Sequence, residues 1–400
     1  MKASESSERY EGKVRECCNY AARSEKNFSE NVKTIKRQPC GADETRLADT
    51  LKEDLNGFCD TVTEEKFPVS QKAYILSNLL VFIFMLLASA TAILSFFFEE
   101  IIMAASILFS ILSLLAFFGA FGGTSKKLES KNIFATRNCS EDVKNRIIIE
   151  ANLDAPFKRK ISVKTERGLK IFNFFLILVN IAFGIVSLLI SFTDLDFAFC
   201  DKFIYIAFIT PLFAIVPIVL SRSVIITEST PGVSDNLVGC YTACGALRYM
   251  SEMDLRLKNT ELCVLLTGAR NAKQAGAKAY TESHAEADKA VDTTVISLNT
   301  IYNAENLCFL TKDKKLDKFM NDAAKNADVM ITDAEPKYIK TEAKVFKKAK
   351  ISNVTMTTLP DEIPTFYDSV ADTNDYIHVP AIEATMKTVL EAAYLKDSVQ

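Results

Sequence analysis

Histidine, the commonest metal ligand in proteins, is rare in this 400-residue sequence. The chain contains two histidines, His284 and His378, and ten cysteines without any C-x-x-C spacing. Cys240 and Cys244 lie four residues apart, which places them on one face of a helix. Small buried residues give that spacing more often than a metal pair does. Spacing alone therefore predicts no metal centre, and the cysteine usage suits a reducing compartment.

The composition indicates that apolar and polar blocks are separated along the chain. Hydrophobic residues make up 49% and charged residues 24% of the sequence, an unusual combination for an evenly mixed soluble chain. The net charge of −3 gives no basic surface for nucleic acid. With 13 glycines and 10 prolines, fibrous and low-complexity classes are excluded. This pattern favours a membrane protein that carries a soluble domain.

Apolar segments long enough to cross a bilayer, which takes roughly 18 or more residues, occur at residues 73–98, 101–122, 169–192 and 203–220. They form two hairpins whose turns carry mainly acidic residues, whereas lysine and arginine flank the open ends. An excess of lysine and arginine is typical of the cytoplasmic side. We therefore expect a multi-pass membrane protein with its soluble part in the cytoplasm.

The predicted spans contain no ionisable residue near their centres, where an ion or proton path usually has one. Anchoring is therefore favoured over transport, which stays open as an alternative.

The soluble segments, residues 1–72, 123–168 and 222–400, alternate between helix and strand patterns. Strands are predicted near residues 61–69, 132–136, 146–151, 261–267, 295–301, 328–332 and 351–357. Helices are predicted near residues 44–57, 236–251, 272–288 and 376–395. Together they predict one α/β domain with a mixed sheet flanked by helices, interrupted by transmembrane hairpins at residues 73–122 and 169–221.

Five motifs, in order along the soluble segments, resemble the two-zinc aminopeptidases, the metallopeptidase family of bacterial leucyl aminopeptidase and glutamate carboxypeptidase. They are R-x-P-x-G at residues 37–41, S-K-N-I-F-A at 130–135, G-V-S-D-N at 232–236, T-G-A at 267–269 with G-A-K-A-Y at 276–280, and Y-D-S-V-A-D-T at 367–373. The resemblance implies the αβα sandwich of that family.

Members of that family hold two divalent ions that share a bridging carboxylate, and a glutamate acts as general base. The resemblance places the bridging aspartate at Asp235 and the supporting aspartate at Asp154. The remaining positions differ from the family pattern: Asn152, Asn271 and Asn299 at ligand positions, Arg270 at the general-base position and Asp368 at the position of the last histidine. Neither histidine of this chain falls on a ligand position.

A neutral amide oxygen is a poor ligand for zinc, and the guanidinium of Arg270 carries a permanent positive charge. The resemblance therefore implies a metal-free pseudo-peptidase with no catalytic residue and no cofactor. Arg270 either bridges Asp235 and Asp368 in place of the metals, which neutralises buried carboxylates, or turns to solvent. Asp154 is expected to fix a turn as a hydrogen-bond acceptor.

The expected role is that of a membrane-anchored binding or scaffolding protein. Its expected partners are the lipid bilayer and a membrane-proximal peptide or protein. Two alternatives stay open: an active hydrolase with zinc on Asp235, Asp368 and Asp154, and a transport role of the four spans.

Overall fold

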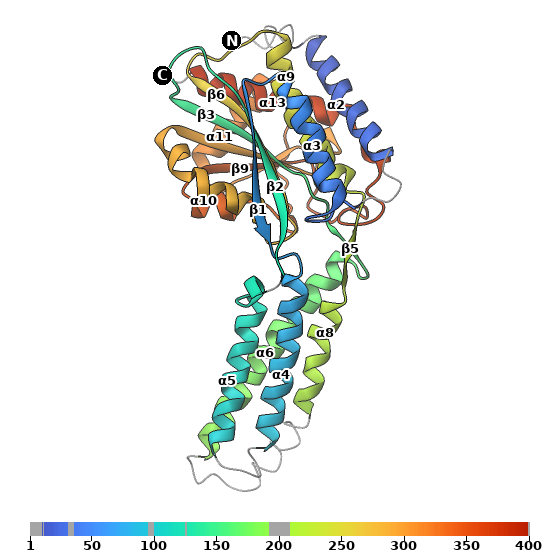
Figure 1. The fold of residues 1–400 in the computed structure, drawn as a ribbon, viewed down its shortest axis with the longest axis vertical. Coiled ribbons are helices and arrows are strands. Elements are labelled where there is room, and N and C mark those ends of the chain that lie inside the picture. The colour runs from blue at the N-terminus through green and yellow to red at the C-terminus, as the bar shows by residue number, and fades with distance from the viewer. Residues whose placement is uncertain are drawn as a thin grey trace. The chain divides into compact units, whose positions relative to one another are not determined.

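The computed structural model describes residues 10, 12–30, 36–94, 100–124, 126–191 and 209–398, which form two compact units. Unit 1 comprises Met1–Val69, Leu128–Lys158 and Thr227–Gln400. Unit 2 comprises Ser70–Lys127 and Arg159–Ile226. Each unit is thus assembled from segments that are far apart in the sequence (Figure 1).

Unit 1 is built on a seven-stranded mixed sheet with the strand order β1-β2-β6-β3-β7-β9-β8. The strands are β1 (Thr61–Val69), β2 (Leu128–Arg137), β3 (Asn145–Asn152), β6 (Thr260–Thr267), β7 (Asp292–Asn299), β8 (Cys308–Leu310) and β9 (Ser352–Thr357). The central strands β6, β3, β7 and β9 are parallel, and the outer strands β1, β2 and β8 pair antiparallel. The parallel strands therefore end at one common edge of the sheet.

Helices cover both faces of this sheet, because side chains of a strand alternate between its two faces. On β3, Ile147 and Ile149 join the large core on one face, and Ile148 joins a smaller core on the other. The large core packs against α2 (Lys13–Glu30), α3 (Ala42–Asn56), α9 (Val238–Glu252), α11 (Lys314–Asn326) and α13 (Val379–Ser398). The smaller core packs against α10 (Ala275–Ala290) and α12 (Ala343–Lys348). The expected αβα sandwich is confirmed.

One predicted strand is wrong: residues 328–332 form an irregular segment. Val329 and Ile331 alternate as strand residues do, and both pack against the large core. Asp328, however, has a left-handed backbone with φ of 54°, and only single hydrogen bonds such as Thr332 N to Leu307 O tie the segment to its neighbours. The period-2 pattern here reflects burial of a loop.

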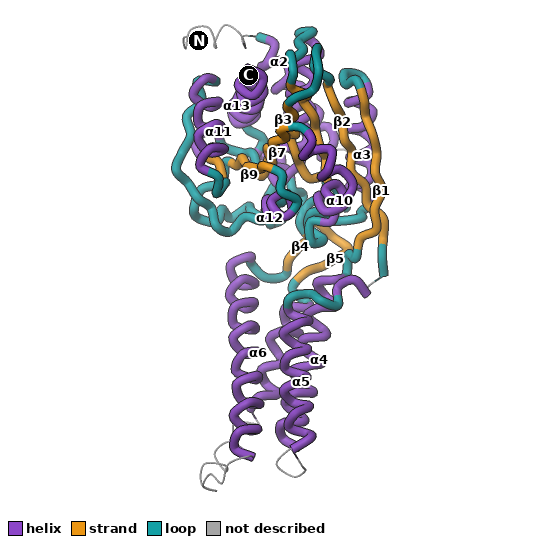
Figure 2. Tube along the Cα trace, turned by 90° about the vertical axis from the view of Figure 1, so that its left-hand side faces the viewer, coloured by secondary structure: helices purple, strands orange, loops and turns teal. Residues whose placement is uncertain are grey.

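Unit 2 consists of helices that lie side by side with nearly parallel axes (Figures 1 and 2). They are α4 (Ala73–Leu94), α5 (Glu100–Phe117), α6 (Val163–Ser191), and the short pair η2 (Thr210–Ala214) and α8 (Ile215–Ser221), with the single turn η1 (Gly122–Thr124) after α5. An apolar core that includes Val81, Met85 and Ile177 joins them. Strands β4 (Phe157–Arg159) and β5 (Val224–Ser229) pair with each other.

The prediction of four spans is supported for two helices of the described chain. Ala73–Leu94 and Val163–Val186 are long and apolar enough to cross a membrane. Ala104–Phe117 and Thr210–Ser221 are apolar but shorter than a bilayer requires. The ends of the predicted spans at residues 95–98, 192 and 203–208 lie outside the described residues. A multi-pass topology is therefore not supported by the structure.

Candidate functional site

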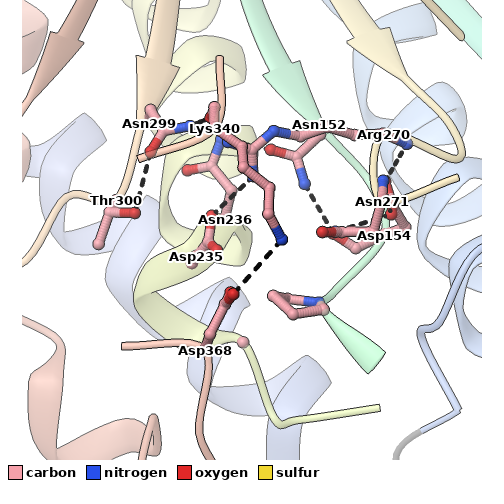
Figure 3. A network of polar contacts seen from close by, with 12 residues as sticks. Asn152, Asp154, Asp235, Asn236, Arg270, Asn271, Asn299, Thr300, Lys340 and Asp368 are labelled. Carbon is pink, nitrogen blue, oxygen red and sulfur yellow. Dashed lines mark hydrogen bonds and ion pairs between the residues drawn. The ribbon is translucent and has the colours of Figure 1, made fainter. Parts of the chain in front are cut away.

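The residues singled out by the sequence gather at the carboxyl edge of the parallel strands. Asn152 is the last residue of β3 and Asn299 is the last residue of β7. Arg270 and Asn271 follow the end of β6 at Thr267 by three and four residues. Figure 3 shows these side chains in one polar network with Asp154, Asp235 and Asp368. Ligands of open α/β sheets bind at this edge, so the network is the candidate site.

Asp154 fixes the loop that follows β6. Its carboxylate is fully buried and accepts hydrogen bonds from Arg270 N at 2.7 Å, Asn271 N at 2.8 Å and Asn271 Nδ2 at 2.9 Å. Burial raises the pKa of Asp154, and the donors from Asn271 and Arg270 oppose that rise. The expectation that Asp154 serves as a turn acceptor agrees with these contacts.

Arg270 points into the network and its side chain is 3% exposed. Its Nη1 lies 3.1 Å from Asp235 Oδ1, its Nε lies 2.9 Å from Glu342 Oε1, and its Nη2 donates to the backbone carbonyl of Lys340. Burial acts to lower the pKa of Arg270, but the carboxylates of Glu342 and Asp235 more than reverse this effect. Arg270 therefore stays charged, and the alternative that it turns to solvent is wrong.

The two carboxylates that Arg270 contacts are themselves deeply buried. The side chains of Asp235 and Glu342 are 2% and 3% exposed. Burial raises the pKa of both carboxyl groups, and the guanidinium opposes the rise in each. The arginine thus supplies the positive charge that two buried carboxylates need.

The expected contact between Arg270 and Asp368 is wrong, whereas the expected contact with Asp235 is present. Asp368, whose side chain is 3% exposed, lies 3.6 Å from Lys340 Nζ. Its backbone is left-handed, with φ of 52°. The carboxylate that shares Arg270 with Asp235 is Glu342, in the loop before α12.

Asp235 is placed by a tight turn that a second aspartate holds. Asp372 Oδ1 accepts from Ser234 N at 2.9 Å and from Ser234 Oγ at 2.7 Å, and its Oδ2 accepts from Asp235 N at 3.2 Å. Burial raises the pKa of Asp372 to about 6. Gly232 begins the turn with φ of 62°, and a Cβ there would lie 2.7 Å from Ala155 Cβ. The peptide bond from Asp235 to Asn236 is cis.

The asparagines of the site are engaged in hydrogen bonds within the protein. Asn236 Nδ2 donates to Asn152 Oδ1 at 3.3 Å and to the Leu298 carbonyl at 2.6 Å. Asn152 Nδ2 donates to the Asp154 carbonyl at 2.7 Å, and Asn299 Nδ2 donates to the Lys340 carbonyl at 3.2 Å. The amide groups use their N–H donors in these contacts, and an ionised carboxylate, which has no N–H, could not replace them.

These residues do not fit a pair of zinc ions. Within the described ranges, no three His, Cys, Asp or Glu side chains converge to hold a metal ion. Asp235, to which the resemblance assigns the bridging role, is in contact with a guanidinium, and three of the ligand positions it implies carry amides, which are poor zinc ligands. His284 lies on α10, where its ring bonds Glu65, and His378 is exposed just before α13.

Comparison with known proteins identifies this architecture. Residues 221–393 match the profile of "Peptidase family M28". A leucine aminopeptidase precursor from Bacteroides thetaiotaomicron has a TM-score of 0.53 at 13% identity, over 95% of this chain and 96% of that one. Residues 221–393 are therefore similar to that family, and the chain shares the fold of this aminopeptidase.

Two further solved structures share the fold. A zinc aminopeptidase from Bacillus subtilis has a TM-score of 0.55 at 10% identity, over 96% of each chain. A glutaminyl cyclase from Bacteroides thetaiotaomicron has a TM-score of 0.53 at 13% identity, over 95% of this chain and 97% of that one. No curated protein sequence matches this chain. The resemblance drawn from the five motifs is confirmed for the fold, and the family profile supports it over residues 221–393.

Sequence reasoning missed four residues that shape the site. Asp372 and Asn236 lie within motifs that were recognised, at residues 367–373 and 232–236, and that position was the available signal. Glu342 and Lys340 lie in the loop that joins α11 to α12, and this loop has no recognised motif. Nothing in the local sequence marks them as partners of Arg270.

Proposed function

We propose that this chain is a membrane-anchored, peptidase-like protein whose site does not catalyse hydrolysis and serves binding or scaffolding. The observation that carries the proposal is the position of Arg270. Its guanidinium contacts Asp235 and Glu342 inside the protein, with 3% of the side chain exposed. A cation fixed beside the bridging carboxylate repels divalent ions, and no general base stands in its place.

Anchoring by unit 2 is supported by its surface. Exposed large hydrophobic side chains of the described residues occur almost entirely on unit 2, the exceptions being Leu128, Val143, Met253, Met330 and Val370. Large exposed apolar surfaces mark contact with a membrane or a partner. We propose that α4 and α6 cross the bilayer, with α5, η2 and α8 packed beside them.

The orientation and the partner complete the proposal. Basic residues stand where the chain passes from the segments of unit 1 into the helices of unit 2. By the positive-inside bias, they favour a cytoplasmic location for unit 1. A membrane-proximal peptide or protein is the proposed partner of the site, because the helices hold the chain at the bilayer.

The test is the zinc content and aminopeptidase activity of the full chain, purified in detergent and supplied with zinc. We expect far less than one zinc per chain and no release of amino acids from peptide amides. The comparison is a variant that restores the family ligands: Asn152→His, Arg270→Glu, Asn271→Glu, Asn299→Asp and Asp368→His. This variant should bind more zinc than the native chain.

A native chain that holds stoichiometric zinc and releases N-terminal residues would overturn the proposal in favour of an active hydrolase. Zinc-independent ion flux through reconstituted liposomes would instead favour the transport alternative. The matched control for the zinc measurement carries Lys315→Gln and Lys318→Gln on α11. These exposed lysines lie outside the site, so the zinc content should equal that of the native chain.

A further inference from the structure

One end of unit 2 carries a ring of exposed cations, which we call the basic ring. Its members are Lys72, Lys126, Lys127, Lys160, Lys164, Arg167 and Arg222, and every one of them is exposed. They flank the start of α4, the end of η1, the start of α6 and the end of α8. Across the described part of the chain, none of these side chains forms a salt bridge.

Contacts between the helix ends hold the basic ring at a single level. Tyr74 of α4 donates to Glu166 Oε1 of α6 at 3.1 Å, and Lys170 Nζ lies 4.7 Å from the centre of the Tyr74 ring. The Lys160 backbone N–H donates to the Ser223 carbonyl at 2.8 Å. The ends of α4, α6 and α8 are therefore neighbours, as Figures 1 and 2 show for the helices themselves.

Nothing within the described residues of unit 2 neutralises the basic ring. Its acids there are Glu100, which begins α5 at the opposite end, and Glu166. Glu166 is buried and already paired with Arg159 and with Lys170. Seven exposed positive charges thus face solvent without an acidic partner from the same unit.

The helix dipole makes this arrangement unfavourable without an external anion. Lys164 and Arg167 lie in the first two turns of α6, which begins at Val163. The amino end of a helix carries partial positive charge and favours anions. The dipole therefore disfavours Lys164 and Arg167 slightly, and an anion that approaches from outside relieves this effect.

The apolar surface begins directly below the basic ring. On α6, Lys164, Arg167, Ile171, Phe175 and Leu178 follow helical spacing along one face, and the last three side chains are 64%, 58% and 42% exposed. The same face therefore changes from cation to hydrocarbon within one turn. Long basic side chains at such a boundary extend to the level of lipid headgroups.

We propose that the basic ring binds the phosphate groups of anionic phospholipids and so selects a negatively charged leaflet. The inference rests on the proposed membrane anchoring by unit 2. Each lysine or arginine near an anionic surface favours binding about fivefold. The ring would both fix the depth of the helices and enrich anionic lipid around them.

The experiment places the full chain in nanodiscs of phosphatidylcholine with a minor fraction of phosphatidylglycerol. The bulk lipid is then removed, and mass spectrometry counts the lipids that stay bound to the protein. We expect about fivefold enrichment of phosphatidylglycerol over the bulk ratio, falling as ionic strength rises. The variant Lys160→Gln, Lys164→Gln, Arg167→Gln, Arg222→Gln should lose the enrichment. The charge-retaining variant Lys160→Arg, Lys164→Arg, Arg167→Lys, Arg222→Lys should keep it.

The matched control removes four exposed lysines of unit 1, with the substitutions Lys312→Gln, Lys315→Gln, Lys318→Gln and Lys325→Gln, and should keep the enrichment. Equal enrichment in the neutral variant and the native chain, or none in either, would overturn the inference. Displacement of lipid by millimolar inorganic phosphate would identify free phosphate as the ligand and also overturn it. A chain that fails to enter lipid at all would instead overturn the anchoring proposal.

Discussion

At the scale of single residues, the site is organised by one buried arginine. Its guanidinium donates hydrogen bonds to Asp235 and to the Lys340 carbonyl and forms an ion pair with Glu342. Burying two carboxylates without a counter-charge would cost several kcal/mol. Arg270 therefore stabilises a polar interior at the carboxyl edge of the sheet.

Removing that charge is expected to destabilise the fold. Arg270→Ala leaves Asp235 and Glu342 buried without their cation, which should lower the free energy of unfolding by about 3–5 kcal/mol. Calorimetry of the detergent-purified chain measures the change as a lower thermal midpoint. Adding Asp235→Asn and Glu342→Gln to Arg270→Ala should recover part of the loss, because the stranded charges are then gone.

The control is Arg256→Ala, which breaks the ion pair between Arg256 and Asp60. The side chain of Arg256 is 38% exposed. Exposed pairs contribute about 0–1 kcal/mol, so its midpoint should stay near that of the native chain. Equal midpoints for Arg270→Ala and Arg256→Ala would contradict the role given to Arg270.

At the scale of elements, the site depends on loops that are fixed at strand ends. The turn η3 (Val233–Leu237) carries Asp235 into the network. It is held from a distant loop, since Asp372 accepts three hydrogen bonds from Ser234 and Asp235. The position of Asp235 is thus decided by a residue more than a hundred places later in the chain.

Asp372→Ala should therefore release the turn. Hydrogen bonds to a charged acceptor contribute about 1.5–3 kcal/mol, and the buried N–H groups would be left unpaired. We expect the free energy of unfolding to fall by about 2–3 kcal/mol, with faster hydrogen exchange at Ser234 and Asp235. Asp375→Ala, at an exposed neighbour that bonds only Thr373 Oγ1, is the control and should leave both measurements unchanged.

At the scale of the whole molecule, the helical segments of unit 2 are inserted where the chain of unit 1 reverses. Val69 and Leu128 are cross-strand partners at the ends of β1 and β2, so residues 70–127 replace a hairpin turn. Residues 160–223 are inserted in the same way between the paired strands β4 and β5. The seven-stranded sheet is therefore continuous across the first insertion, and the second interrupts the separate two-stranded sheet.

A shortened chain tests this independence. Replacing residues 70–127 and residues 160–223 each by Asn-Gly supplies the two-residue turn that antiparallel strands favour. The product should be soluble without detergent, keep a mixed α/β circular dichroism spectrum and unfold in one cooperative transition. Replacing only residues 70–127 is the control, because α6 and α8 then still require detergent. Aggregation of the doubly shortened chain would show that unit 1 depends on the insertions.

The sequence by itself determined the apolar blocks, the αβα layers and most strands of the sheet. These depend on local periodicity: three consecutive isoleucines at 147–149 fill both faces of β3, and a strand buried on both faces needs that pattern. The family motifs also assigned Asp235, Asp154 and Arg270 to positions of the metal site of that family. The prediction of a strand at residues 328–332 was wrong, because a buried loop can show the same alternation of apolar and polar residues as a strand.

Only the tertiary structure decided which groups meet. Arg270 pairs with Glu342, 72 positions along the chain, and the predicted partner Asp368 contacts Lys340 instead. No local pattern encodes that choice, because an ion pair between loops depends on where two separate strands end and how the connecting backbone turns. Local sequence fixes which faces are buried, and the meeting of distant loops fixes which charges neutralise one another.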